Sequence, residues 1–204
     1  MEPRVKKEFV STDGTRKWLI ESFSGKLFEL VYIPEKSRGT LCVSSQVGCA
    51  LKCDFCSTGK LGFINNLTAA EIVAQIRIAI RRLAEIFPEN KKRSVSNIVF
   101  MGMGEPLLNL SNVLPALDVI RSDLGYGISK RRVTVSTSGI VPAISVLADK
   151  ADVSLAISLH APNDRLRDRL MPLNKKYPIS LLLGACRAYS ESFSHKKEIF
   201  VEYT

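Results

Sequence analysis

Three cysteines near residue 50 are the clearest sign of chemistry in this sequence. Cys49, Cys53 and Cys56 form a C-x-x-x-C-x-x-C pattern within GCALKCDFCSTG, in a chain that has five cysteines in all. Such crowding is typical of metal or redox chemistry and differs from the spread-out disulfide framework of a small secreted domain. Gly48 and Gly59 can relax the backbone at either end, so that all three sulfurs point to one side of the loop.

The number of cysteines in this loop separates two kinds of metal site. A structural zinc site generally has four ligands, and the fourth would have to be Cys42, Cys186, His160 or His195, none of which stands at zinc-finger spacing. An iron–sulfur cube also has four irons, but leaving one of them without a protein ligand creates an open position for a substrate or cofactor. The same spacing also arises by chance in globular enzymes.

The elements around this loop follow a regular alternation. Short apolar or β-branched runs alternate with segments of helical period, which predicts βα units and a mostly parallel sheet. The predicted core strands are residues 40–45, 97–101, 132–137, 153–159 and 198–203. The first predicted helix begins at the capping box Thr68–Glu71 and ends near Phe87, and the second covers 111–124. A third has Pro142 in its first turn. A helical stretch broken at Pro172 and Pro178 follows, and the last helix covers 181–193.

These elements predict the fold class. Five core strands with helical crossovers indicate an α/β protein that forms part of a (β/α) barrel, with its polar and glycine-rich loops at the carboxyl ends of the strands. That is the side on which such folds place their chemistry. We expect residues 1–38 to form an N-terminal β lead-in, with strands at 18–20 and 28–33, and residues 39–204 to form the partial-barrel domain.

Composition limits the function further. The 204 residues are 46% hydrophobic, which is enough for a substantial core. A formal net charge of +9 favours a polyanionic partner, although paired lysines on loops are often only solvated. The basic residues cluster at Lys91–Arg93, Lys130–Arg132, Lys175–Lys176 and Lys196–Lys197. No apolar run is long enough to cross a bilayer, so we expect a cytoplasmic protein without a membrane partner.

Five motifs extend the cysteine pattern into a family resemblance. With the aromatic Phe55 before its last cysteine, the loop resembles the signature of the radical S-adenosylmethionine superfamily. From about residue 13 to residue 203 the chain resembles the bacterial ribosomal RNA adenine-C2 methyltransferases, dual-specificity enzymes that also modify a transfer RNA adenine. The C8-methylating resistance enzymes share the cysteine loop but are less similar around residues 104–109. The motifs are LCVSSQVGCALKCDFCSTG, FMGMGEPLLN, SKRRVTVSTSG, LAISLHAPND and PLNKKY.

This resemblance implies cofactors, partners and a mechanism. The cofactors would be a 4Fe–4S cluster and S-adenosyl-L-methionine, the substrates 23S ribosomal RNA and transfer RNA, and the electron donor a protein such as flavodoxin; we expect a monomer. In the family, the open iron binds the amino and carboxylate groups of the cofactor, and reduction of its sulfonium releases a 5'-deoxyadenosyl radical. That radical takes a hydrogen atom from a methyl group on a protein cysteine. The resulting carbon radical adds to C2 of adenine, which ordinary methyl transfer cannot reach.

The resemblance also assigns roles to single residues. Cys49, Cys53 and Cys56 would bind the cluster, and Gly104–Glu105 would bind the amino group of the cofactor. Further cofactor contacts would come from Ser136, Ser158, Leu159 and His160. Glu29 would be the proton acceptor, and Cys42 would resolve the adduct as a disulfide, whereas we expect Cys186 in the core.

Without the resemblance, the same residues have plainer interpretations. GMGE would be a tight turn, Ser136 an ordinary cap and His160 a packed loop residue. Glu29 would be a solvated strand glutamate, and Cys42 a small buried thiol.

Parts of the family pattern have no match in this sequence. The methyl-carrying cysteine, a further asparagine contact and the last part of the barrel would lie beyond Thr204, and an N-terminal helical domain would precede Met1. We therefore expect an incomplete barrel with an exposed sheet edge and no full turnover by this chain. Two other classes stay open: a radical enzyme that acts on a small molecule or peptide, and a zinc-bearing RNA-binding module that binds no S-adenosylmethionine.

Overall fold

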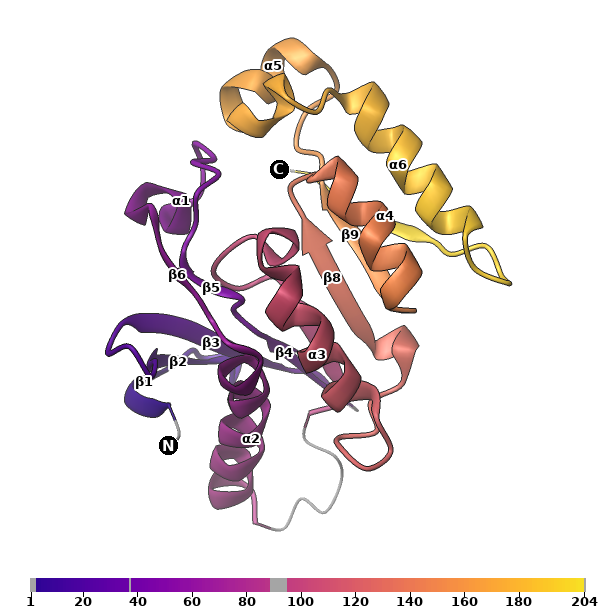
Figure 1. Ribbon diagram of the computed structural model, residues 1–204. Helices are drawn as coiled ribbons and strands as arrows, with labels where there is room; N and C mark the ends of the chain where they lie inside the picture. Colours follow the sequence, from indigo (N-terminus) through magenta and orange to yellow (C-terminus); the bar gives the residue numbers. More distant parts are fainter. Residues whose placement is uncertain (1–2, 37, 89–94, 204) are drawn as a thin grey trace.

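The computed structural model describes residues 3–36, 38–88 and 95–203 (Figure 1). The predicted basic cluster Lys91–Arg93 lies outside these residues. The described chain forms an eight-stranded mixed sheet in the order β1-β2-β3-β4-β7-β8-β9-β10 and a separate two-stranded sheet, β5-β6. It is an α/β fold, as predicted, and its main sheet is open.

The main sheet has an antiparallel half and a parallel half. Its antiparallel strands are β1 (Arg4–Val10), β2 (Arg16–Glu21) and β3 (Leu27–Pro34), and β3 also pairs with β4. Its parallel strands are β4 (Gly39–Cys42), β7 (Asn97–Phe100), β8 (Val133–Thr137), β9 (Ser154–Ser158) and β10 (Ile199–Glu202). All five predicted core strands are therefore confirmed as neighbours in chain order.

The differences from prediction lie beside β4 and at the N-terminus. The strand predicted over 40–45 ends at Cys42, because the chain then turns to form β5 (Gln46–Gly48), which pairs with β6 (Phe63–Asn66). The strand β1 has no sequence signal because nearly all its side chains are exposed. Across the boundary predicted at residue 38, Pro34 of β3 pairs with Gly39 of β4. The division into two domains stays a prediction.

The helices follow the predicted pattern except for the short helix α1 at residues 57–61, which was not predicted. They are α1 (Ser57–Leu61), α2 (Ala69–Ile86), α3 (Leu110–Arg121), α4 (Val141–Lys150), α5 (Asp164–Leu170) and α6 (Ile179–Glu191), with 3-10 turns η1 (Pro106–Asn109), η2 (Lys130–Arg132) and η3 (Pro172–Lys175). Both halves of the Thr68–Glu71 capping box are present at the start of α2. The breaks predicted at Pro172 and Pro178 are the first residue of η3 and the N-cap of α6.

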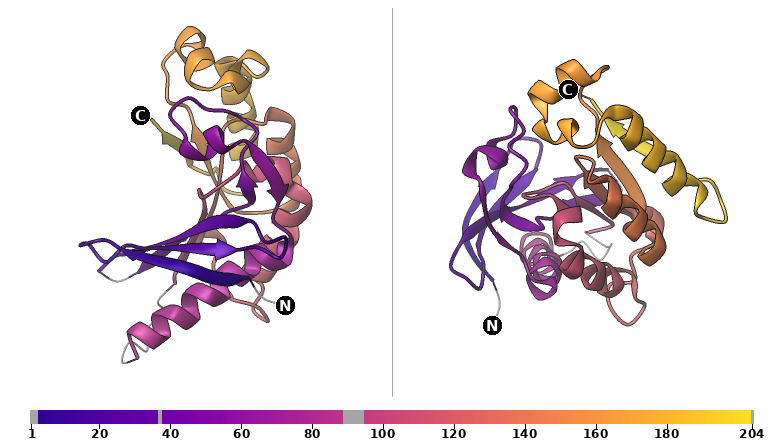
Figure 2. Two further views of the ribbon diagram at one scale, coloured as in Figure 1. Left: turned by 90° about the vertical axis from the view of Figure 1, so that its left-hand side faces the viewer. Right: turned by 45° about the horizontal axis from the view of Figure 1, so that its top comes forward.

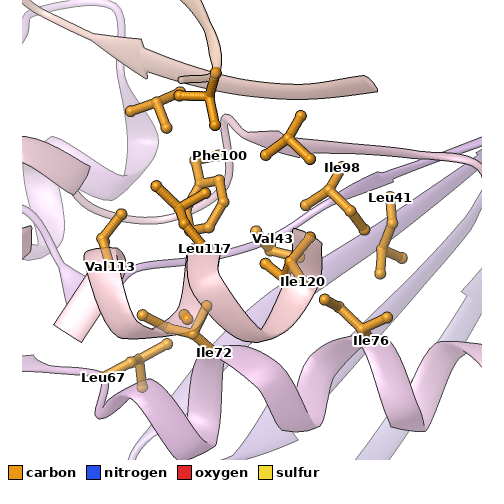
Figure 3. Close-up of a cluster of buried hydrophobic side chains, with 14 of the residues drawn as sticks. Leu41, Val43, Leu67, Ile72, Ile76, Ile98, Phe100, Val113, Leu117 and Ile120 are labelled. Carbon is orange, nitrogen blue, oxygen red and sulfur yellow. The ribbon is translucent and has the colours of Figure 1, made fainter. Parts of the chain in front are cut away.

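The hydrophobic core lies between the sheet and a layer of helices. The helix α2 packs against α3 and α4 packs against α6, so the helices cover one side of the strands (Figures 1 and 2). Figure 3 shows the part of this core where α2 and α3 meet β4 and β7, and each labelled side chain is at most 1% exposed. The labelled residues are Leu41, Val43, Leu67, Ile72, Ile76, Ile98, Phe100, Val113, Leu117 and Ile120.

Strand side chains alternate between the two faces of a sheet, so the neighbours of buried residues such as Leu41 in β4, Val135 in β8 and Ile157 in β9 face away from the helices. Cys42 of β4, Ser136 of β8 and Ser158 of β9 therefore lie on the face that the helices leave uncovered. At the far edge, β10 pairs only with β9 within the described residues, and Phe200 and Val201 are more than half exposed. None of the described helices has the length and apolar character needed to cross a membrane.

Candidate functional site

A cavity of about 250 Å³ opens at the carboxyl ends of the parallel strands. The three cysteines and all the predicted cofactor contacts except Leu159 line it, although they come from four separate parts of the chain. The predicted residues in its wall are Cys49, Cys53, Cys56, Gly104, Glu105, Ser136, Ser158 and His160. The fold thus brings the predicted cluster and cofactor residues together at one place.

The cysteine loop begins where β5 approaches the turn before β6. Gly48 has a φ of 74°, and a Cβ there would lie 1.8 Å from the main-chain oxygen of Gly62, so no other residue fits this approach. The amide of Cys49 donates to the same oxygen at 3.0 Å. Gly59 acts differently from the prediction: it lies inside α1, where a Cβ would stand 3.2 Å from the amide nitrogen of Cys53.

The cysteine thiols influence one another. Burial raises the pKa of Cys53 to about 11, with further contributions from Cys49 and Cys56, while a hydrogen bond with Ser138 acts in the opposite direction. Burial also raises the pKa of Cys49. All the cysteines are free, so metal binding here would release protons.

The spacing of these ligands separates a single ion from a cluster. Within residues 3–36, 38–88 and 95–203, no group of three or more His, Cys, Asp or Glu side chains could hold one metal ion. A zinc ion needs its ligands about 2.0–2.3 Å from one point. The three cysteines of a 4Fe–4S cluster bind three different irons, so they need only surround a cavity. Three thiols that line one cavity fit such a cluster.

The GMGE loop is packed tightly against the chain that follows β4. A Cβ on Gly102 would lie 2.8 Å from the main-chain oxygen of Val43. Gly104 has a φ of 96°, and a Cβ there would lie 2.4 Å from Cβ of Gln46. The amide of Glu105 donates to Oε1 of Gln46 at 2.9 Å. These contacts determine where the carboxylate of Glu105 enters the cavity.

Glu105 is a buried acid held by backbone amides. Its Oε2 accepts from the amide of Ser138 at 2.8 Å, and its Oε1 accepts from the amide of Leu107 at 3.1 Å. Burial raises its pKa, and these hydrogen bonds oppose the rise. Hydrogen bonds from the side chains of Thr137 and Ser138 also lower its pKa. Glu105 lines the cavity, so its carboxylate can meet a cationic group there.

Glu202 on β10 is a site residue that sequence reasoning missed. Its Oε1 accepts from Oγ of Ser136 at 3.3 Å, and its Oε2 accepts from Oγ of Ser158 at 3.2 Å. Its main-chain oxygen accepts from the amides of Leu159 and His160 at 3.0 and 3.2 Å. An acid at the carboxyl end of a predicted parallel strand was the available signal.

His160 closes the cavity beside the cysteine loop. Its ring packs edge-on against Phe55 with 4.7 Å between the ring centroids, and its φ of 55° is unusual for a residue other than glycine. Burial lowers the pKa of His160, although Glu202 opposes the effect. A neutral imidazole at physiological pH follows from this balance.

Cys42 and Glu29 do not line the cavity. Cys42 pairs with Val31 and Val99 on the neighbouring strands, and burial raises the pKa of its thiol to about 11. The side chain of Glu29 is 42% exposed and forms an ion pair with Nζ of Lys17 at 3.0 Å. The roles expected for these two residues stay predictions, whereas Cys186 lies in the hydrophobic core, as expected.

Sequence comparison relates the chain to known proteins. The sequence profile of the radical SAM superfamily matches residues 43–201. The chain is 56% identical over 202 residues to "Dual-specificity RNA methyltransferase RlmN" from Pseudomonas fluorescens (strain SBW25) and 57% identical to the protein of that name from Pseudomonas putida (strain GB-1). Each match covers 99% of this chain and 53% of the relative, so the chain spans about half the length of these relatives.

A solved structure extends the similarity to three dimensions. The structure of a radical SAM methyltransferase from Sphaerobacter thermophilus is 43% identical in sequence and superimposes with a TM-score of 0.91. The match covers 100% of this chain and 58% of that one. The arrangement of strands and helices is therefore shared over the whole of the present chain.

Proposed function

The chain belongs to the radical SAM superfamily, and we propose that it forms the cluster- and cofactor-binding core of an enzyme that methylates C2 of adenine in RNA. We propose 23S ribosomal RNA and transfer RNA as the substrates. The observation that carries the proposal is the convergence of the cysteine loop, the GMGE loop and the ends of β8 and β9 on one cavity. The names of the relatives support the class of substrate.

The cofactors of this superfamily are a 4Fe–4S cluster and S-adenosylmethionine. Cys49, Cys53 and Cys56 would hold the cluster, because they are the thiols that line the cavity. When bound, this pair supplies a radical that can take a hydrogen atom from an unactivated carbon. The remaining chemistry depends on how the chain binds and shields these groups.

Glu105 and its neighbours supply the binding contacts. The buried carboxylate of Glu105 would accept hydrogen bonds from the ammonium group of the cofactor, a charge-assisted contact of the stronger kind. Ser136 and Ser158 add hydroxyl groups to the wall of the cavity. The packed rings of Phe55 and His160 would limit the entry of water beside the cysteine loop.

We also propose roles outside the cavity. Cys42 would resolve the methylated adduct as a disulfide and Glu29 would accept the proton from C2, as the family resemblance implies. The enzyme would act as a monomer in the cytoplasm, where its RNA substrates are found, and would receive electrons from a protein such as flavodoxin.

The first test is electron paramagnetic resonance on anaerobically reconstituted, reduced protein, with and without S-adenosylmethionine, together with iron and sulfide analysis. We expect a 4Fe–4S signal that changes when S-adenosylmethionine is added. Cys53→Ala should lose this signal, whereas Cys186→Ala, which removes a core thiol, should keep it. Zinc in place of iron, or a signal that S-adenosylmethionine does not change, would refute the proposal.

The RNA substrate needs a separate assay. A protein in which this chain is extended to the length of its relatives would be incubated with 23S ribosomal RNA fragments and transfer RNA under reducing conditions. Mass spectrometry should then detect adenine methylated at C2. Methylation at C8, or of a non-RNA substrate only, would contradict the assignment of substrate while leaving the cluster assignment intact.

A further inference from the structure

Arg167 on α5 is completely buried although it carries a charge. Its guanidinium donates to the main-chain oxygens of Ser138 at 2.8 Å, Ser158 at 2.9 Å and Leu159 at 3.1 Å. A fourth hydrogen bond, at 2.8 Å, goes to Oδ1 of Asn174. Within the described residues it forms no ion pair, so three carbonyls and one amide satisfy its charge.

A buried charge without a carboxylate partner is costly, and an apolar side chain of similar volume would avoid that cost. The planar fork of arginine can bond several carbonyls at once in a defined geometry, which lysine cannot do. Ser138 follows β8, and Ser158 and Leu159 lie at the end of β9. One side chain therefore joins the carboxyl ends of two neighbouring strands.

These carbonyls belong to the segments that form the cavity. The amide of Ser138 donates to Glu105, and the side chain of Ser138 forms a hydrogen bond with the thiol of Cys53. Ser158 lines the cavity directly. Arg167 thus contacts, through one residue, both a predicted cluster ligand and the predicted cofactor carboxylate.

The helix of Arg167 is also bonded to the cysteine loop. The amide of Asp54, which directly follows Cys53, donates to the main-chain oxygen of Leu170 at 2.9 Å. Burial lowers the pKa of Arg167, and the nearby Cys53, Asp164 and Asp168 oppose that effect. Arginine stays charged in proteins, so a fixed positive charge lies behind the Cys53 side of the cavity.

We propose that Arg167 is a positioning residue for this site. Its guanidinium holds the ends of β8 and β9 against the cysteine loop, and its charge makes the cluster bound to Cys53 easier to reduce. The potentials of iron–sulfur clusters depend on nearby charge and hydrogen bonding, so a positive group should favour the more negative, reduced state. This inference rests on the proposed function, because it requires a cluster in the cavity.

The test compares three variants of the anaerobically reconstituted protein. Arg167→Lys keeps the charge but loses the fork, Arg167→Met loses both, and Arg169→Met removes an exposed charge from the same helix as the matched control. For each variant, the dissociation constant for S-adenosylmethionine and the midpoint potential of the cluster are measured by electron paramagnetic resonance. Thermal unfolding is recorded alongside.

Both Arg167 variants should bind S-adenosylmethionine at least tenfold more weakly, whereas Arg169→Met should match the wild type. Arg167→Met should also shift the equilibrium toward the oxidised cluster about tenfold, which is about 59 mV for a one-electron couple. Arg167→Lys should keep the wild-type potential.

Two outcomes would overturn the inference. One is wild-type affinity for S-adenosylmethionine in Arg167→Lys, which decides the question of geometry even if Arg167→Met does not fold. The other is an unchanged potential in a folded Arg167→Met protein. A wild-type protein without any cluster would instead refute the proposed function, so the two failures are distinguishable.

Discussion

At the scale of single residues, the site depends on acids that are held by the backbone and by serines. Glu105 enters the cavity from the loop after β7 with one amide donor on each carboxylate oxygen. Glu202 enters it from β10 with one serine hydroxyl on each oxygen. The two acids differ in the elements that hold them, so their substitution should have separable effects.

Glu202→Gln should weaken binding of S-adenosylmethionine about tenfold and should also lower thermal stability, because a hydrogen bond to a charged group contributes about 1.5–3 kcal/mol. The amide has no charge and retains only one acceptor oxygen, so neither serine keeps a hydrogen bond to a carboxylate, and one of them must accept from the amide nitrogen instead. Isothermal titration of the reconstituted protein measures the affinity. Glu198→Gln, an exposed acid at the other end of β10, is the control, and equal losses in both variants would contradict the role of Glu202.

The thiol of Cys42 should react slowly at neutral pH. Because burial raises its pKa from 9 to about 11, alkylation by iodoacetamide should increase about tenfold per pH unit up to about pH 11. Peptide mass spectrometry gives the rate for Cys42 alone. Between pH 9 and 11 the thiol stays protonated in the folded state but loses its proton in the unfolded state. The free energy of unfolding should therefore fall as the pH rises through this range. Rapid labelling at pH 7 would contradict the burial.

At the scale of elements, glycines determine how closely the loops approach one another. The GMGE loop packs on the segment after β4, where a Cβ at Gly104 would overlap Gln46. The cysteine loop begins against the turn before β6, where a Cβ at Gly48 would overlap the main-chain oxygen of Gly62. These two glycines therefore explain how the cysteine loop and the GMGE loop, which are far apart in the sequence, can line the same cavity.

Gly104→Ala should destabilise the protein more than Gly25→Ala. Both glycines have a positive φ, which costs an alanine about 1–2 kcal/mol. Gly25 has no atom within 4 Å of its built Cβ, whereas Gly104 would also meet Gln46 at 2.4 Å. Urea unfolding should show the larger loss for Gly104→Ala, and cofactor binding should fall only in that variant. Equal losses would mean that the close approach is easily relaxed.

At the scale of the whole molecule, the fold places the basic clusters of the described residues at two ends. Lys175 and Lys176 follow α5 on the side of the cavity, whereas Lys130–Arg132 and Lys196–Lys197 precede β8 and β10 at their amino ends. An RNA whose adenine reaches the cavity should contact the first group. The sequence alone treats these clusters as equivalent.

Replacing Lys175 and Lys176 with alanine should therefore weaken RNA binding and reduce its salt dependence. Each lost phosphate contact should lower the slope of log K against log salt by about 0.7 for single-stranded RNA. Arg131→Ala combined with Lys196→Ala, which removes the same charge at the opposite end, should leave the slope unchanged. Filter binding over a series of salt concentrations measures both, and equal slopes in the two variants would show that binding is not confined to the cavity side.

Local patterns in the sequence were enough to predict most of the helices and strands. The capping box at Thr68–Glu71, the prolines at 142, 172 and 178 and the apolar runs of the parallel strands each report a conformation of neighbouring residues. They fail where a strand is stabilised by pairing alone. β1 is almost fully exposed, and β5 is only three residues long, so neither has an apolar pattern to detect.

The sequence by itself determined which thiols could bind a cluster, because their spacing within one loop is a local property. It also determined the order of the five parallel strands, since βα units place successive parallel strands side by side. Only the tertiary structure decided that Glu202 meets Ser136 and that Arg167 meets Ser138. Those contacts join residues 66 and 29 positions apart, and their geometry depends on strand register and helix packing. No local pattern carries that information.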